Sequence, residues 1–309
     1  MPGIITHDFF GRDLLTSHAE YAGAADERLA FMLGCQGPDP LLYIRIDPRA
    51  RSWKPLGCIF HEEKPAELLV ALRNTVDALA EEERSIGLAY ARGFLAHYAL
   101  DRQVHPLVYA QQFALCDAGV AGLEKKDGTY VHAVIESSID EVVLFCKRHE
   151  TIRVWKPYQN ILQGSDKMIA LVSRMYARMA QEAFYLEPPE TLFADAVQCF
   201  RLCQRALYSP EPRRRRFVSN AERLIKRHSL YDAVSHHANA SYACAYDNHE
   251  SALWQNPFTG RKSTLDFWSL YQQALGLAAS AIEMIEQPTF DLGTARELTG
   301  NLNFSGDPV

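Results

Sequence analysis

The segment GFLAHYALDRQVHP, residues 93–106, constrains the fold more than any other part of the sequence. His97, Asp101 and His105 recur in it at intervals of four residues. In an α-helix, with about 100° per residue, these three side chains lie within about 80° of one another on one face. The intervening residues are largely apolar, which predicts a buried helix. Buried imidazole and carboxylate groups need compensation, and ligation of a metal ion satisfies all three together.

A second segment, YVHAVIESSIDEV, places His132 and Glu136 four residues apart on another predicted helix. Two such helices facing each other form a mixed histidine and carboxylate site, as in many helical metal-binding proteins. Taken alone, a His–Glu pair at this spacing also fits a hydrogen-bonded surface pair. The metal-site interpretation therefore depends on the two helices together.

Three more candidates lie outside these helices. Asp39 stands between prolines in QGPDPLLY, His61 precedes a predicted helix start in GCIFHEEKP, and His7 lies in IITHDFFG. Alone, each of them fits a turn or capping role better than a metal site.

The order of these residues carries a resemblance. The chain resembles the zinc-dependent phospholipase C and P1 nuclease superfamily, in its bacterial phospholipase C-like branch. The most specific part is a His-xxx-Asp pair on one helix followed by a His-xxx-Glu pair on the next. The match covers about the first half of the chain, and the stretch NHESALWQNPFTGRKSTLDFW, residues 248–268, extends it with less specificity. The residues that reproduce the ligand series of the family are His7, Asp39, His61, His97, Asp101, His105, His132 and Glu136.

The resemblance implies an all-α fold, a single multi-helical domain over residues 1–309 that holds two or three zinc ions. One ion would be bound by four residues, namely Asp39, His61, His97 and Asp101. A second would be bound by His105, His132 and Glu136. Asp101 would bridge to a third ion, shared with His7. Histidine and carboxylate sites also accept other divalent metals, according to supply.

The implied activity is metal-dependent hydrolysis of a phosphodiester, as in a phospholipase C. Asp39 is the candidate general base, since one carboxylate oxygen can bind zinc while the other faces a water molecule. The expected substrate is a small phosphoester or a phospholipid headgroup. The aromatic candidates to line its pocket are Tyr43, Tyr98, Trp254 and Phe258, although ordinary packing roles fit these residues better. The alternative is a non-catalytic helical metal-binding protein with a structural or partner-binding role.

Helical periodicity dominates the chain, and alternating strand patterns are short, as in LLYIRI. Irregular structure is expected over residues 34–64 and 236–263, and the tail from Pro288 is expected to pack loosely. Pro106 is expected to halt the central helix. The predicted helices cover residues 16–33, 65–83, 85–105, 107–118, 129–148, 166–185, 190–208, 212–227 and 264–286.

Composition narrows the function classes. The formal net charge of −6 argues against a general nucleic-acid binder, which carries a basic face. No signal peptide and no bilayer-spanning apolar run is evident, so a soluble cytoplasmic protein is expected. The seven cysteines form no CxxC pair and are expected to be reduced thiols.

Two smaller features have alternative interpretations. The run Arg213–Arg216 fits a solvated helix start or a contact with phosphate or anionic lipid. The adjacent His7–Asp8 pair is also found in HD-type phosphohydrolases, which carry it on a helix. The β-branched run before His7 does not suggest a helix, and this disfavours the HD-type interpretation.

Overall fold

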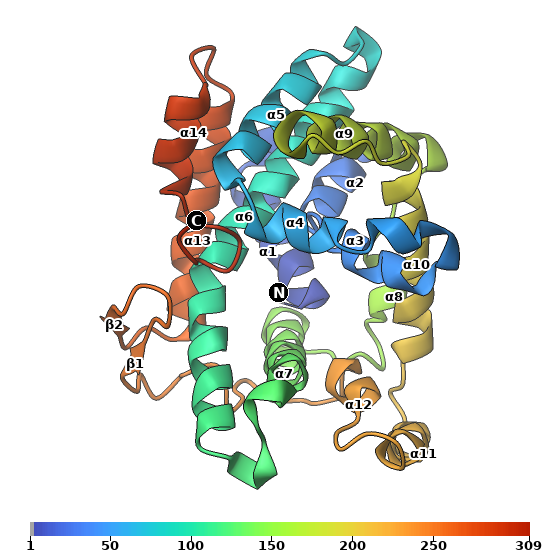
Figure 1. Ribbon diagram of the computed structural model, residues 1–309, viewed down its shortest axis with the longest axis vertical. Helices are drawn as coiled ribbons and strands as arrows, with labels where there is room; N and C mark the ends of the chain where they lie inside the picture. The colour runs from blue at the N-terminus through green and yellow to red at the C-terminus, as the bar shows by residue number, and fades with distance from the viewer. Residues whose placement is uncertain (1–2) are drawn as a thin grey trace.

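The computed structural model describes residues 3–309, and over this range the chain is mostly helical (Figure 1). The α-helices are α1 (Ile4–Ser17), α2 (Ala25–Gly34), α3 (Pro40–Tyr43), α4 (Leu56–Glu62), α5 (Pro65–Asp77), α6 (Glu81–Asp117), α7 (Gly128–Arg148), α8 (Pro157–Asn160), α9 (Asp166–Phe184), α10 (Leu192–Leu207), α11 (Pro212–Arg223), α12 (Leu230–Val234), α13 (Phe267–Ile285) and α14 (Leu292–Thr299). The expected all-α class is confirmed at this level.

The remaining regular structure is short. Five 3-10 helices are η1 (Ala19–Tyr21), η2 (Ile44–Ile46), η3 (Pro48–Trp53), η4 (Val120–Gly122) and η5 (Lys125–Asp127). Two short strands, β1 (Trp254–Gln255) and β2 (Lys262–Ser263), pair in antiparallel fashion. They form the only sheet within the described residues.

Helix α6 is the central element of the fold. It is 37 residues long and packs against α2, α13, α7, α5, α1 and α9. In Figure 1 it runs from the level of α5 and α9 down the left of centre, and its lower half lies beside α7. Because α6 contacts so many helices, residues on its different faces meet side chains from distant parts of the chain.

Helices α2 and α6 cross closely at two glycines. A Cβ atom at Gly93 would collide with the carbonyl oxygen of Phe31, and a Cβ at Gly34 would collide with that of Tyr90. Only residues without a side chain allow the two backbones to come this close. The crossing places the loop that follows α2, and therefore Asp39, beside the middle of α6.

Helix α1 contradicts the expectation that the segment before His7 is not helical. The helix begins at Ile4, and its N-terminus is capped by a distant residue. The backbone N–H groups of Ile5 and Thr6 donate to the carboxylate of Asp140 on α7, at 3.1 and 2.7 Å. A carboxylate at a helix N-terminus satisfies N–H groups that have no partner within the helix. This tertiary contact outweighs the weak helix propensity of the β-branched run.

Pro106 does not halt the central helix, as the sequence had suggested, but lies inside α6. A proline leaves the carbonyl four residues earlier without its usual partner. That carbonyl, of Arg102, lies against the C-terminal turn at Gly306, where an added Cβ would come within 2.8 Å of it. Gly306 has a φ of 74°, a conformation that glycine adopts without strain. The turn at Gly306 therefore packs over the part of α6 where the carbonyl of Arg102 lacks its usual hydrogen-bond partner.

Three other boundary predictions were wrong. The predicted helix over residues 16–33 is divided, because α1 ends at Ser17 and α2 begins at Ala25. Residues 34–64 contain α3, η2, η3 and α4 instead of irregular structure, so LLYIRI is helical and not a strand. His61 therefore lies within α4 and not in a loop before a helix.

The C-terminal region is packed and not loose. It forms α14, in which Ala295 is fully buried, and Phe304 beyond it is 1% exposed. The hydroxyl of Tyr98 on α6 donates to the carbonyl of Leu302 at 2.6 Å. Contacts with the central helix hold this segment, and local sequence patterns do not reveal them.

Over residues 3–309, no helix is both long and apolar enough to cross a lipid bilayer. All seven cysteines are free thiols, as expected.

Candidate metal centre

The eight candidate ligands come from four helices and one loop. His97, Asp101 and His105 lie on one face of α6 and are 0%, 0% and 3% exposed. The others lie on the elements around that face. His7 is on α1, Asp39 is in the loop before α3, His61 is on α4, and His132 and Glu136 are on α7.

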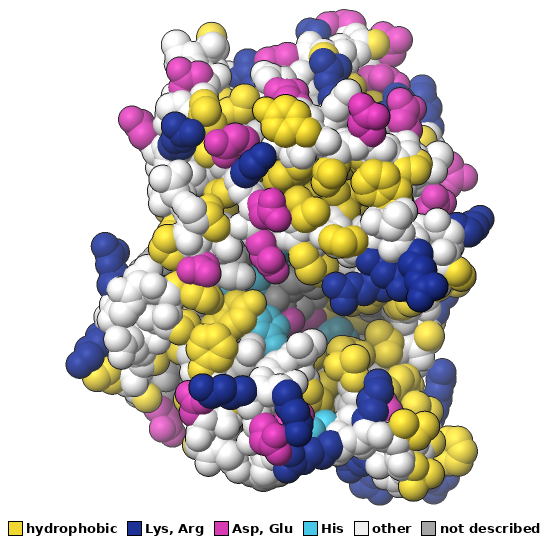
Figure 2. All heavy atoms as spheres, in the orientation of Figure 1, with side chains coloured by type: hydrophobic (Ala, Val, Ile, Leu, Met, Phe, Trp, Pro, Cys, Tyr) yellow, Lys and Arg dark blue, Asp and Glu magenta, His cyan; other side chains and the backbone are white. Residues whose placement is uncertain are grey.

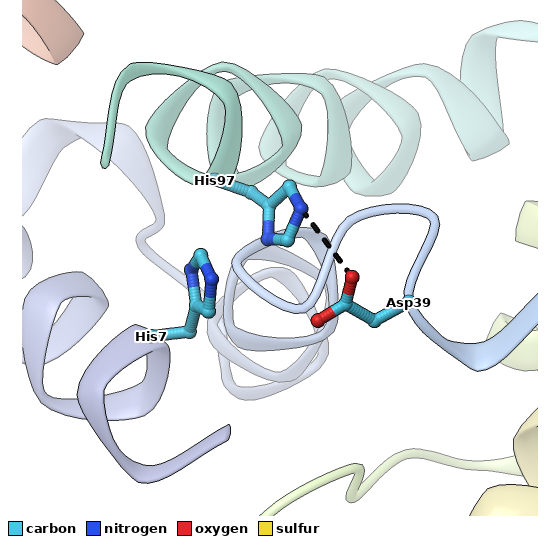
Figure 3. Close-up of side chains that lie close together, drawn as sticks. All are labelled: His7, Asp39 and His97. Carbon is cyan, nitrogen blue, oxygen red and sulfur yellow. Dashed lines mark ion pairs between the residues drawn. The ribbon is translucent and has the colours of Figure 1, made fainter. Parts of the chain in front are cut away.

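Figure 3 shows three of these side chains converging from α1, α6 and the loop before α3. Ligand atoms of His7, Asp39 and His97 lie within 4.8 Å of one another. The rings of His7 and His97 stack with their centroids 4.2 Å apart. All three side chains are fully buried. The stacked imidazoles and the carboxylate thus share one closed space.

A first group surrounds His97. Its Nε2 atom lies 3.2 Å from Oδ2 of Asp101 and 3.7 Å from Oδ1 of Asp39. Nε2 of His61 lies 3.0 Å from the same Asp39 oxygen. These four residues are the set that the resemblance implies for one zinc ion, and the structure brings them together.

A second group lies one turn further along α6. Nε2 of His105 is 3.7 Å from Oε1 of Glu136, and Nε2 of His132 is 2.9 Å from the same oxygen. Asp101 links the two groups, because its Oδ1 atom lies 4.0 Å from His105 Nε2. Oδ1 also lies 3.1 Å from His7 Nε2. Asp101 is therefore shared among three histidines, with His97 on its other oxygen.

The outer nitrogen of four histidines has an oxygen partner. The Nδ1 atoms of His61, His97 and His105 lie 2.6, 3.1 and 2.8 Å from the carbonyl oxygens of Gly57, Cys35 and Phe304, respectively. Nδ1 of His132 lies 2.7 Å from Oε1 of Gln112. An amide carbonyl only accepts, so each Nδ1 carries the proton. Each ring then presents its Nε2 atom to the interior of the site, which is how metal-ligating histidines are usually oriented.

Several inward-facing atoms have no hydrogen-bond partner among the described residues. They are both ring nitrogens of His7, Oδ2 of Asp39, Nε2 of His97, both carboxylate oxygens of Asp101 and Nε2 of His105. The 3.1 Å approach of His7 to Asp101 lacks the alignment of a hydrogen bond. A buried polar atom without a partner costs about 1–3 kcal/mol, and more when charged. Cations between these lone pairs would offset that cost, so the residues fit a metal cluster.

The pKa shifts of three buried histidines agree with ligation, whereas the pKa of His97 is raised, because Asp101 and Asp39 outweigh the effect of burial. Burial lowers the pKa of His7, of His105 and, most strongly, of His132. Burial alone would raise the pKa of Asp101, but His97 and His105 hold this pKa well below its usual value. Neutral imidazoles around an ionised carboxylate are the forms that bind a divalent cation.

Sequence reasoning missed Asp140, which lies one helical turn beyond Glu136 on α7. Besides capping α1, it accepts hydrogen bonds from Thr6 Oγ1 at 2.6 Å and His236 Nε2 at 2.7 Å. Gly3 lies so close that a Cβ atom there would overlap this carboxylate. The residue fixes the start of α1 and therefore the position of His7. The spacing His132, Glu136, Asp140 was the available signal.

The loop histidines do not join the cluster. His236 pairs with Asp140, and His249 pairs with Asp247 at 2.7 Å. The His7–Asp8 pair is divided, because Asp8 binds Arg12 at 2.6 Å while His7 faces the cluster. His7 and Asp8 therefore do not form one HD-type site, although both lie on a helix.

The four aromatic residues that the sequence offered as pocket candidates do not lie together in the structure. Tyr43 stacks on Phe200, Tyr98 is buried against the C-terminal segment, and Trp254 donates to Leu265, so these three have packing roles. Phe258 instead approaches the cluster from the side of His132.

Phe258 does so through Tyr109. The Tyr109 ring centroid lies 5.2 Å from that of Phe258 and 4.9 Å from that of His132. The ring centroid of Phe113 lies 5.7 Å from that of Tyr109, and Phe113 is 41% exposed. Figure 2 shows a hollow in this face, with histidine and acidic side chains visible inside and hydrophobic side chains beside it. The side chains of His132 and Glu136, at the edge of the cluster beside this aromatic surface, are 15% and 13% exposed.

No family model matches this sequence, and neither a curated protein nor a solved structure matches it.

Proposed function

We propose that the chain binds a cluster of zinc ions and hydrolyses a phosphodiester, in the manner of the zinc-dependent phospholipases C and P1 nucleases. The observation that carries the proposal is the position of Asp101. Both of its oxygens are buried without hydrogen-bond partners among the described residues, and three histidine Nε2 atoms lie within 4.0 Å of it. An ionised carboxylate in that position is best explained by bridging cations.

The proposed ligand sets follow the two groups around α6. Asp39, His61, His97 and Asp101 would hold one ion. His105, His132 and Glu136 would hold a second. His7 and Asp101 would contribute to a third. Other divalent metals suit the same nitrogen and oxygen donors.

Zinc ions bound there would supply a water molecule of lowered pKa and positive charge for the phosphate oxygens. The protein holds the ligands in place through the carbonyl groups behind His61, His97 and His105. Asp39 is the candidate general base, since Oδ1 faces His61 and Oδ2 has no hydrogen-bond partner among the described residues. Oδ2 can therefore accept a proton from the attacking water.

The substrate class is a small phosphodiester or a phospholipid headgroup. Tyr109, Phe113 and Phe258 provide an apolar surface beside His132 on which the organic part of such a substrate can pack. The net charge of −6 disfavours long nucleic acids as substrates.

The test combines metal analysis with hydrolysis. The untagged protein is purified and its metals per chain are measured by elemental analysis. Hydrolysis of bis(p-nitrophenyl) phosphate is then followed with added zinc and after treatment with a chelator. Two or three zinc ions per chain and chelator-sensitive hydrolysis are expected. A protein that binds no metal after zinc is added back would contradict the proposal.

The second candidate is a non-catalytic metal-binding protein. The burial of the ligands favours this alternative, since His7, Asp39, His97 and Asp101 are all fully buried. Structural zinc sites are closed, whereas catalytic sites keep an open position. Bound zinc that raises the melting temperature, together with no hydrolysis of phosphodiesters or phospholipids, would select this alternative.

A further inference from the structure

Helix α11 directs a mostly polar face toward the protein and exposes large apolar residues to solvent. Ser219 is its only buried residue, and Arg215, Val218 and Glu222 beside it are half-buried. The spacing of four and three residues puts these polar side chains on one face of the helix. An ordinary surface helix is oriented the other way, with its apolar face toward the core.

Polar contacts hold the helix in this orientation. Arg215 Nε lies 3.1 Å from Oδ1 of Asp232 on α12. Oε2 of Glu222 accepts hydrogen bonds from Ser229 Oγ at 2.8 Å and from the Tyr231 amide at 3.0 Å. Helix α12 in turn packs on α7, which carries two of the candidate ligands. The orientation of α11 is therefore built into the fold.

The outward side of α11 and of the turn that follows it carries large apolar residues. Phe217, Ala221 and Leu224 follow one another at helical spacing, and Ile225 lies next to Leu224. Phe217, Leu224 and Ile225 are 77%, 87% and 90% exposed. Single exposed apolar residues are common, but three large ones on one projecting element form a patch that indicates an interaction surface.

The same segment is strongly basic. Residues 212–227 contain seven arginines and lysines and one acidic residue, in a chain whose net charge is −6. Arg213 and Arg216 are exposed and form no ion pair within residues 3–309. Unpaired cations beside an apolar patch complement a surface that offers both anions and hydrocarbon.

We propose that residues 212–227 dock the protein on an anionic phospholipid surface. Phe217, Leu224 and Ile225 would insert between the lipid molecules, and the arginines would contact the phosphates. Helices that lie in the membrane interface combine these two faces, and each cation near an anionic surface adds about 1 kcal/mol.

The shape and position of the segment favour a lipid surface over other partners. Contacts with nucleic-acid phosphates use cations and have no use for three projecting apolar side chains. In Figure 2 the hydrophobic and basic side chains over α11, at the lower right, lie on the face that carries the hollow. Docking there would present phospholipid headgroups to the candidate metal centre, a consequence that rests on the proposed function.

The experiment is sedimentation of the full-length protein with sucrose-loaded vesicles. One set is phosphatidylcholine alone, and the other contains equal amounts of phosphatidylcholine and phosphatidylglycerol. We expect the protein to sediment with the anionic vesicles, less so as salt is raised, and to stay in solution with phosphatidylcholine. Failure to bind anionic vesicles at low salt would overturn the inference, whatever the activity of the protein.

Two variants separate the apolar and basic contributions. The triple substitution Phe217→Ser, Leu224→Ser and Ile225→Ser should weaken vesicle binding by about tenfold or more. The double substitution Arg213→Gln and Arg216→Gln should weaken it by about fivefold per charge. The matched control, Arg178→Gln with Tyr185→Ser, changes an exposed cation and an exposed aromatic residue at α9 and should bind as the wild type does.

Two further measurements distinguish the remaining outcomes. Hydrolysis of the soluble bis(p-nitrophenyl) phosphate should be the same in the wild type and both variants, because α11 holds no candidate ligand. Vesicle binding without hydrolysis would support the docking segment while removing the proposed function. Equal vesicle binding by the triple variant and the wild type, or binding of duplex DNA that the triple substitution leaves unchanged, would overturn the inference.

Discussion

Asp101 lies near more histidines than any other carboxylate of the candidate centre, and its side chain has no hydrogen-bond partner among the described residues. Its carboxylate lies near three imidazoles, yet neither oxygen has a well-aligned donor among the described residues. A side chain in this position contributes through its charge and through both oxygens. Replacing it with an amide of the same shape therefore tests the centre with little change in packing.

We expect Asp101→Asn to lose at least one zinc ion per chain and to lower phosphodiester hydrolysis by more than about 100-fold, because even residues behind the ligands typically contribute 10–100-fold. Elemental analysis and the hydrolysis rate measure the two effects. Asp247→Asn is the matched control, since Asp247 is also buried and paired with a histidine but lies outside the cluster. A fully active, zinc-loaded Asp101→Asn protein would remove the assignment.

Glu141 on α7 provides a pH-dependent test. Burial raises its pKa from 4.5 to about 7, although the backbone N–H of His237 donates to it. The unfolded chain therefore releases this proton at lower pH than the folded chain. The contribution of Glu141 to the free energy of unfolding is complete below about pH 4.5 and is lost as the pH rises toward 7.

Accordingly, Glu141→Gln should raise the free energy of unfolding by about 2 kcal/mol at pH 8, with a smaller gain at pH 5. Glutamine keeps an oxygen for the His237 N–H group. Urea unfolding at both pH values measures the difference, with the exposed Glu250→Gln as control. A gain that is equal at the two pH values would show that titration of Glu141 is not the cause.

At the scale of elements, the close crossing of α2 and α6 determines where Asp39 lies. Gly93→Ala places a methyl group against the carbonyl of Phe31 and should lower the free energy of unfolding by about 3 kcal/mol or more. Gly276→Ala on α13 is the control, because nothing lies within 4 Å of an added Cβ there.

Alanine at that open helical position should stabilise the protein by about 0.5–1 kcal/mol. Thermal unfolding of both variants tests the pair. Equal melting temperatures for the two variants would contradict the close crossing.

At the scale of the whole molecule, the C-terminal segment completes the centre. The carbonyl of Phe304 accepts the Nδ1 hydrogen of His105, and its amide donates to the carbonyl of His61 at 3.1 Å. The centroid of its ring lies 5.1 Å from that of the His61 ring and 5.7 Å from that of the His97 ring. The last residues of the chain thus contact ligands from α4 and α6.

Phe304→Ala should lower the free energy of unfolding by about 3–4 kcal/mol, because it leaves a cavity beside these rings. It should also weaken zinc retention during dialysis, since the His61 and His97 rings lose their packing partner. Phe217→Ala, at an exposed position, should change stability by less than about 0.5 kcal/mol. Zinc retention equal to that of the wild type would mean that the C-terminal segment does not support the centre.

The sequence by itself determined the helical class and the nature of the candidate ligands. His97, Asp101 and His105 share a face because helical periodicity is a local property, and the same holds for His132 and Glu136. Only the tertiary structure decided where α1 begins, because Asp140 from α7 caps it. Likewise, only the tertiary structure showed that α6 continues past Pro106, where Gly306 packs against it. These features arise from contacts between residues far apart in the chain, which local propensity does not encode.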